Sequence, residues 1–185
     1  MGVLLMRKSF GSFFIGMLFV FIDIRIGVID IFADPIGYWF VYYGAIRLIG
    51  IYPISRRAKN GSVMLAFLSI PTVFISKNAI FHPLSFLGIY IPLLQFLTII
   101  VMLFLFQLML QIAKEKSNVL YKQTRLFSIV YISAMILIFL FQSFSTTTLK
   151  MGLENFIILL SIITFVLNIT FLVWLFRFRM FPGDR

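Results

Sequence analysis

The chain contains no cysteine and a single histidine, His82. The absence of cysteine excludes disulfides, thiolate metal sites and cysteine nucleophiles. One histidine excludes the paired histidines of an H-E-x-x-H zinc site. The sequence also has no G-x-S-x-G, no P-loop and no G-x-G-x-x-G. We therefore predict a protein that is not an enzyme and that needs no cofactor.

Charged residues are scarce as well: they make up 12% of the 185 residues, and only six are acidic. Apolar residues take their place, at 62% of the chain, with 24 phenylalanines and a mean hydropathy of +1.08. An ordinary soluble domain is about 45–50% apolar and about 25% charged. A chain of this length has too little interior to bury so much apolar surface, so the composition predicts an integral membrane protein.

Six apolar segments approach the length needed to cross a bilayer, which is about 20 residues with a range of about 17–25. They cover residues 9–24, 35–52, 62–76, 85–113, 124–144 and 154–178. The predicted fold class is an all-α polytopic bundle of about six transmembrane helices. Residues 1–185 form one transmembrane domain.

Local signals mark some of the boundaries and one contact. Asp34-Pro35 is a good helix start, because Asp can cap free backbone amides and Pro is welcome at the first helical position. Asn60-Gly61-Ser62 predicts a turn before the third span. Ser12 and Gly16 are small residues four positions apart in the first span, and this pattern favours close approach of another helix.

The basic residues orient the predicted bundle, because cytoplasmic loops collect Lys and Arg. With six spans, most of them fall on one side: Arg7, Lys8, Arg56, Arg57, Lys59, Lys114, Lys116, Lys122, Arg125, Arg177, Arg179 and Arg185. This distribution predicts that both termini are cytoplasmic. The net charge of +10 is dispersed beside helix ends, so we interpret it as topology plus attraction to anionic lipids at the cytoplasmic face. No nucleic-acid-binding fold accompanies it, and no nucleic-acid partner is expected.

Polar side chains lie within the spans. Ser161, Thr164 and Asn168 share one face of the sixth predicted helix, and Gln107 and Gln111 are four residues apart in the fourth. Such residues either line an aqueous path or make hydrogen bonds between helices, and the second interpretation is the one we favour.

The segment between the first two spans, FIDIRIGVIDIFADPIGY at residues 21–38, places charges among Ile, Val and Phe. A solvated loop would not be this apolar, so we expect a short re-entrant or interfacial hairpin. Asp34 is explained by capping, and Arg25 is the nearest compensating charge for Asp23. Asp30 has no such explanation.

Two interpretations of Asp23, Arg25, Asp30 and Asp34 remain open. They either form an ion-pair and capping network that holds the hairpin, or a carboxylate site for a cation or protons at the outer face. Carboxylates and backbone carbonyls suit hard cations. The spacing matches no EF-hand loop, so the identity of any metal ion is open.

The same segment resembles one found in small, uncharacterised multi-pass membrane proteins of Gram-positive, spore-forming bacteria. Those proteins often read D-I-x-I-x-x-x-D-I-L-P-D-x-I-G-Y. The matching positions here are Asp23, Asp30, Asp34, Ile36, Gly37 and Tyr38, and the sequence departs from the pattern in having Ala33-Asp34-Pro35. The resemblance implies a bacterial plasma membrane and no particular activity.

The sequence leaves two functions in view. The first is a multi-pass membrane protein that acts through lipid, through copies of itself or through another membrane protein. The alternative is a carrier or channel for a small ion or solute that uses the aspartates of the outer face.

Overall fold

The computed structural model describes residues 2–22, 25–26, 29–30, 34–73, 86–148 and 154–180. Within these ranges the chain is helical apart from short turns and a two-stranded ladder of four residues, so the all-α part of the predicted fold class is confirmed and its transmembrane part stays a prediction. The elements are α1 Gly2–Phe21, β1 Arg25–Ile26, β2 Ile29–Asp30, α2 Asp34–Ile46, α3 Ser55–Leu68, the 3-10 helix η1 Ile70–Val73, α4 Phe86–Lys116, α5 Asn118–Thr148 and α6 Glu154–Met180.

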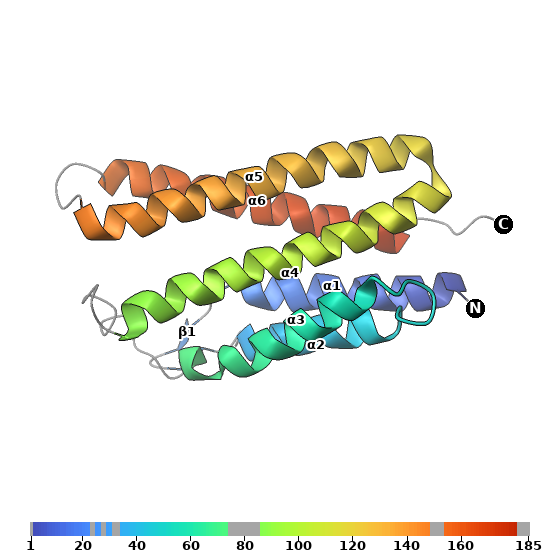
Figure 1. Ribbon diagram of the computed structural model, residues 1–185, viewed down its shortest axis with the longest axis horizontal. Helices are drawn as coiled ribbons and strands as arrows, with labels where there is room; N and C mark the ends of the chain where they lie inside the picture. The colour runs from blue at the N-terminus through green and yellow to red at the C-terminus, as the bar shows by residue number, and fades with distance from the viewer. Residues whose placement is uncertain are drawn as a thin grey trace.

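The helices lie along the long axis of the molecule, and the chain reverses at its two ends (Figure 1). Both termini and the α2–α3 and α4–α5 connections lie at the right of Figure 1. We call this the basic end, and it comprises residues 2–8, 47–59, 114–125 and 177–180. The β1–β2 ladder, η1 and the start of α6 lie at the left. We call this the hairpin end, and it comprises residues 25–26, 29–30, 34–36, 68–73, 86–90 and 154–158.

Four of the helices are long and apolar enough to cross a bilayer: α1, α4, α5 and α6. The other two are short, since α2 has 13 residues and α3 has 14. At 1.5 Å per residue each extends about 20 Å, whereas a bilayer hydrocarbon core is about 30 Å thick. Hence the structure shows a helix bundle with four helices of spanning length and composition, while α2 and α3 fall short of ordinary spanning helices.

One boundary predicted from the sequence is wrong. Asn60, Gly61 and Ser62 do not form a turn, because they lie inside α3, which begins at Ser55 instead of near residue 62. Gly61 has a packing role: a Cβ added there would lie 2.9 Å from Cγ2 of Val101 on α4. Ser62 donates its hydroxyl to a carbonyl one turn earlier in α3, so it does not cap the helix. The chain turns earlier, at residues 47–54.

Helices α1 and α2 meet backbone to backbone at a pair of glycines. A Cβ built on Gly16 would lie 2.5 Å from the carbonyl oxygen of Gly37, and one built on Gly37 would lie 2.6 Å from that of Gly16. Further along α2, Gly44 faces the ring of Phe13, which would lie 2.6 Å from an added Cβ. The close approach predicted from Ser12 and Gly16 is therefore confirmed at Gly16, and the partner helix is α2.

The last helix packs against the first one. The rings of Phe10 on α1 and Phe178 on α6 stack with centroids 5.3 Å apart, and those of Phe21 and Phe171 meet edge to face at 6.1 Å. Phe171 also belongs to an aromatic cluster in the middle of the bundle. Rings that touch in this cluster have centroids less than 6 Å apart, and its members are Phe106, Phe127, Tyr131 and Phe171. The core is thus built from α4, α5 and α6 on one side and α1, α2 and α3 on the other.

The glycine contact leads to a stability prediction. Gly37→Ala places a methyl group where the carbonyl of Gly16 already lies, so the helices must separate. We expect a loss of about 1–3 kcal/mol, the usual cost of overpacking, measured by unfolding of the purified protein in detergent. Gly50→Ala is the matched control, because an added Cβ there meets nothing within 4 Å. Equal stability of the two variants would contradict the proposed contact.

Candidate functional site

The charged segment between α1 and α2 contains an antiparallel pair of short strands. Arg25 is aligned with Asp30, and Ile26 with Ile29. Asp23 lies outside the described residues, and so does its predicted pairing with Arg25. The register gives Asp30, the residue that the sequence left unexplained, an oppositely charged residue at the paired position. Opposite charges at paired positions stabilise a ladder by about 0.2–1 kcal/mol.

Asp34 is the first residue of α2, so the helix start predicted from Asp34-Pro35 is confirmed. Its side chain is half-buried. A carboxylate in the first turn also interacts favourably with the positive end of the helix dipole. Among the described residues no three His, Cys, Asp or Glu side chains come together in a group that could hold a metal ion.

The polar residues predicted on one face of the sixth helix have separate surroundings. Asn168 accepts a hydrogen bond from the hydroxyl of Tyr131 on α5 at 3.0 Å. Thr164 donates to the carbonyl of Leu160 within its own helix, and Ser161 is exposed. Asn168 therefore makes the kind of interhelical bond that is worth about 0.6 kcal/mol on average in membranes.

Tyr131 is the residue at this junction that sequence analysis missed. It is fully buried, and its hydroxyl also lies 3.2 Å from the sulfur of Met102, so it joins α4, α5 and α6. A tyrosine flanked by apolar residues in the middle of a predicted span was the available signal, because a buried phenol needs a hydrogen-bond partner.

The two glutamines predicted on α4 are both half-buried. Oε1 of Gln107 is buried and has no hydrogen-bond partner, and the side chain lies in a groove between α4 and α5 with Ser128 and Ser133. The helices are joined instead by a different glutamine pair, in which Nε2 of Gln95 donates to Oε1 of Gln142 at 2.9 Å. Gln107 and Gln111 therefore do not form the interhelical contact between α4 and α5.

At the basic end, hydrogen bonds connect the ends of neighbouring helices. Arg47, just after α2, donates to Oγ of Ser12 on α1 at 2.9 Å. Tyr52, in the turn that follows, is buried and donates its hydroxyl to the carboxylate of Glu115 on α4 at 2.9 Å. Ser55 donates to the carbonyl of Ala45, which caps the end of α2. None of these contacts was evident from the sequence, because the partners are up to 63 residues apart.

Tyr52 is held in its neutral form by these surroundings. Burial raises its pKa from 10.0 to about 12, and the hydrogen bond to Glu115 and the charge of that carboxylate act in the same direction. A phenol that donates to a carboxylate loses that bond when it ionises, so the contact lasts only while Tyr52 is protonated.

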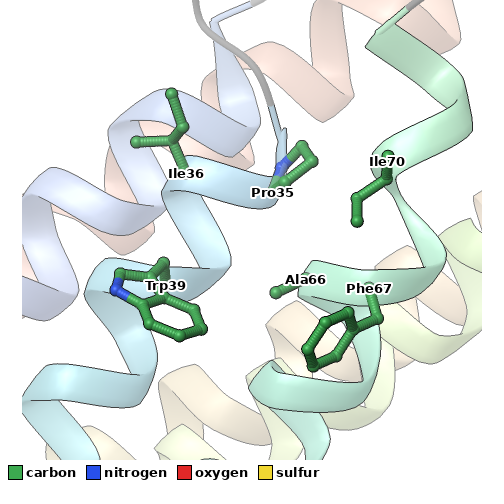
Figure 2. Close-up of a pocket in the computed structure, with 6 residues that line it drawn as sticks. All are labelled: Pro35, Ile36, Trp39, Ala66, Phe67 and Ile70. Carbon is green, nitrogen blue, oxygen red and sulfur yellow. The ribbon is translucent and has the colours of Figure 1, made fainter.

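Between α2 and α3, near the hairpin end, the surface has an apolar hollow of about 290 Å³. Its lining comes from both helices and from η1: Pro35, Ile36, Trp39, Ala66, Phe67 and Ile70. Figure 2 shows Ala66 between the rings of Trp39 and Phe67, with Pro35 on the side where the chain enters α2. The rings of Trp39 and Phe67 are exposed, so the hollow opens to the outside of the bundle.

No protein-family model matches the chain, and the searches of curated proteins and of solved structures likewise found no match.

The Arg25–Asp30 register can be tested with a double-mutant cycle. If the two residues interact, Asp30→Asn and Arg25→Gln should each lower stability, and the double variant should lose less than the two losses added together. The expected coupling is about 0.2–1 kcal/mol, read from unfolding in detergent. A cation site predicts a different result. In that case Ca²⁺ or Mg²⁺ would stabilise the native protein, and Arg25→Gln would strengthen the effect because it removes a repelling charge.

The raised pKa of Tyr52 predicts how stability depends on pH. Below about pH 10 the phenol is protonated in both the folded and the unfolded chain, and its contribution to stability is complete. Between pH 10.0 and about 12 the unfolded chain loses this proton first, so stability falls as the pH rises. The measurement compares native protein with Tyr52→Phe at pH 9 and pH 11, and the advantage of the native protein should shrink at the higher pH. In Glu115→Gln the same decline should be smaller, and an unchanged decline would argue against the Tyr52–Glu115 contact.

Proposed function

We propose that the chain is a multi-pass protein of a bacterial plasma membrane that crosses the bilayer six times, with both termini in the cytoplasm. We further propose that it is not an enzyme and that it acts through lipid or through other membrane proteins, copies of itself included. The observation that carries this proposal is the distribution of charge along the bundle.

Among the described residues, every lysine and arginine except Arg25 lies at the basic end: Arg7, Lys8, Arg47, Arg56, Arg57, Lys59, Lys114, Lys116, Lys122, Arg125, Arg177 and Arg179. Asp34, at the start of α2, and Glu154, at the start of α6, belong to the hairpin end. A soluble bundle has no reason to sort its charges in this way. A membrane protein does, because its cytoplasmic side collects Lys and Arg.

The outer surface of the bundle supports the same proposal. Large apolar side chains are exposed along nearly the whole length of α5 and α6, among them Leu126, Ile129, Val130, Leu137, Leu140, Ile158, Ile162, Phe165, Val166 and Val173. Soluble monomers rarely expose apolar patches larger than a few hundred Å². In a bilayer this surface meets acyl chains and needs no further cover.

Six crossings require that the bilayer adapt to α2 and α3. Both helices lie within the bundle and run between its two ends (Figure 1), yet each extends only about 20 Å. A short hydrophobic segment is accommodated by local thinning of the bilayer at a cost of fractions of a kcal/mol per Å. The aromatic group on the exposed side of α2, formed by Trp39, Tyr42 and Tyr43, suits the headgroup level that thinning would bring closer.

A role through lipid or partners fits the chemistry at both ends. The basic end presents cations that attract anionic lipids by about 1 kcal/mol per residue near the surface. Polar side chains in the bundle form hydrogen bonds between different helices. The pairs are Tyr131 with Asn168, Gln95 with Gln142, and Tyr38 with Thr98. These hydrogen bonds stabilise the packing of the helices, so the polar groups that make them have a structural role.

The topology can be tested with single cysteines, because the chain contains none of its own. Lys59→Cys and Ser117→Cys place the thiol at the basic end, and Thr147→Cys places it at the opposite end of α5. An impermeant maleimide added to intact cells should label only Thr147→Cys. After the cells are opened, all three should react, which controls for thiol accessibility.

Labelling of Ser117→Cys in intact cells would overturn the six-span topology. Labelling of Lys59→Cys in addition to Thr147→Cys, with Ser117→Cys unlabelled, would instead show that α2 and α3 do not cross while the four long helices do.

A further inference from the structure

The lining of the hollow between α2 and α3 contains one polar side-chain atom, the indole nitrogen of Trp39 (Figure 2). Its floor is Ala66, which is 6% exposed, and its walls are the rings of Trp39 and Phe67, which are 44% and 64% exposed. A space of about 290 Å³ between such groups cannot hold ordered water, because a bound water needs two to four polar partners. If the space were empty, the lining atoms would lose their dispersion contacts on one side.

In a bilayer the available filling is hydrocarbon. The hollow opens on the outside of the bundle, and Pro35 and Ile70 place its upper part at the hairpin end (Figure 2). Trp39 also contacts Tyr42 and Tyr43, with ring centroids 5.4 and 5.8 Å away. Amphipathic rings of this kind gather where the acyl chains give way to headgroups. Pro35, which lines the hollow, is the second residue of α2, so a chain lying in the hollow would have its headgroup near the start of α2.

The charge at that place restricts the headgroup. Asp34 precedes Pro35 directly, and Arg25, the basic residue described at this end, is aligned with Asp30 in the β1–β2 ladder. A headgroup with net negative charge would meet the carboxylate of Asp34 there. An ammonium headgroup would be attracted both by the carboxylate and by the faces of the exposed aromatic rings.

We propose that this hollow is a lipid site that holds one acyl chain of a phospholipid with an ammonium headgroup and no net negative charge. The aromatic rings of Trp39 and Phe67 hold the chain from two sides, and Asp34 selects the headgroup. This proposal rests on the proposed insertion of the chain in a membrane.

The test uses the two tryptophans of the chain, Trp39 and Trp174. Trp174→Phe leaves Trp39 as the reporter at the hollow, and Trp39→Phe leaves Trp174, which packs on Phe127 far from the hollow. Each purified variant in detergent is titrated with phosphatidylcholine that carries a brominated acyl chain, because bromine quenches tryptophan on contact. Trp39 fluorescence should fall to a plateau near one lipid per protein, while Trp174 should show a weak decline without a plateau.

Brominated phosphatidylglycerol provides the headgroup control. It should need a severalfold higher concentration than phosphatidylcholine to reach the same quenching of Trp39. Equal or tighter binding of phosphatidylglycerol would overturn the assignment of the headgroup. If neither lipid gives a plateau in the quenching of Trp39, the site itself is overturned.

Variants of the lining separate the hollow from the general lipid surface. Ala66→Phe fills the floor and should abolish the plateau. Phe67→Ala removes one wall from an exposed position and should weaken binding severalfold. Met64→Ala is its matched control, since Met64 is an exposed residue of α3 that does not line the hollow. If Ala66→Phe fails to fold, the comparison of Phe67→Ala with Met64→Ala decides, and equal binding by these two variants would overturn the proposal.

The outcome stays separate from that of the proposed topology. The cysteine labelling reads the orientation of the chain in cells, whereas bromine quenching reads contact with one acyl chain in detergent. Correct labelling without saturable quenching would remove the lipid site and leave the membrane topology intact. Labelling that contradicts the topology would remove the reason to expect an acyl chain at the hollow.

Discussion

The contact between Gly16 and Gly37 is the constraint on which the rest of the bundle depends. Two helices whose backbones approach this closely have little freedom in spacing or in crossing angle, because no side chain separates them. The position of α2 on α1 then determines where α3 can return, and α3 with Gly61 lies closely against α4. Three glycines at helix contacts thus determine the geometry of the half of the molecule that contains the short helices.

The other half is held by aromatic rings and a few polar contacts. Phe171 meets Phe21, Phe106 and Tyr131, so one ring of α6 contacts α1, α4 and α5. In lipid, apolar packing alone distinguishes poorly between one helix arrangement and another, since acyl chains offer similar contacts. The hydrogen bond of Tyr131 to Asn168 requires one particular arrangement, and therefore adds specificity to the packing of the rings.

The sequence predicted those features that are determined locally. The all-α class, the start of α2 at Asp34 and the close approach at Gly16 follow from composition, capping chemistry and residue size, and the structure agrees with each of them. Gly61 shows where such reasoning fails: a glycine permits a turn and also permits a helix contact, and only the position of α4 decides between them. The same holds for Asn168 and Tyr52, whose partners come from other helices.

The charged hairpin is an intermediate case. The sequence indicated that residues 24–33 reverse the direction of the chain, and it identified Asp30 as the carboxylate without an explanation. The structure aligns Asp30 with Arg25, and Ile29 with Ile26. No composition or spacing argument could choose that register, because shifting it by one residue would leave the hydrophobic content of the segment unchanged.

The contact of the first helix with the last one has a consequence for biosynthesis. Helices α1 and α2 can join as soon as both have left the ribosome, but Phe10 has to wait for Phe178, which follows 168 positions later along the printed sequence. Until then the face of α1 that α6 will cover is open to lipid or to a chaperone of the membrane. This contact therefore forms only after translation has passed Phe178, and until then the uncovered face distinguishes the unfinished bundle from the finished one.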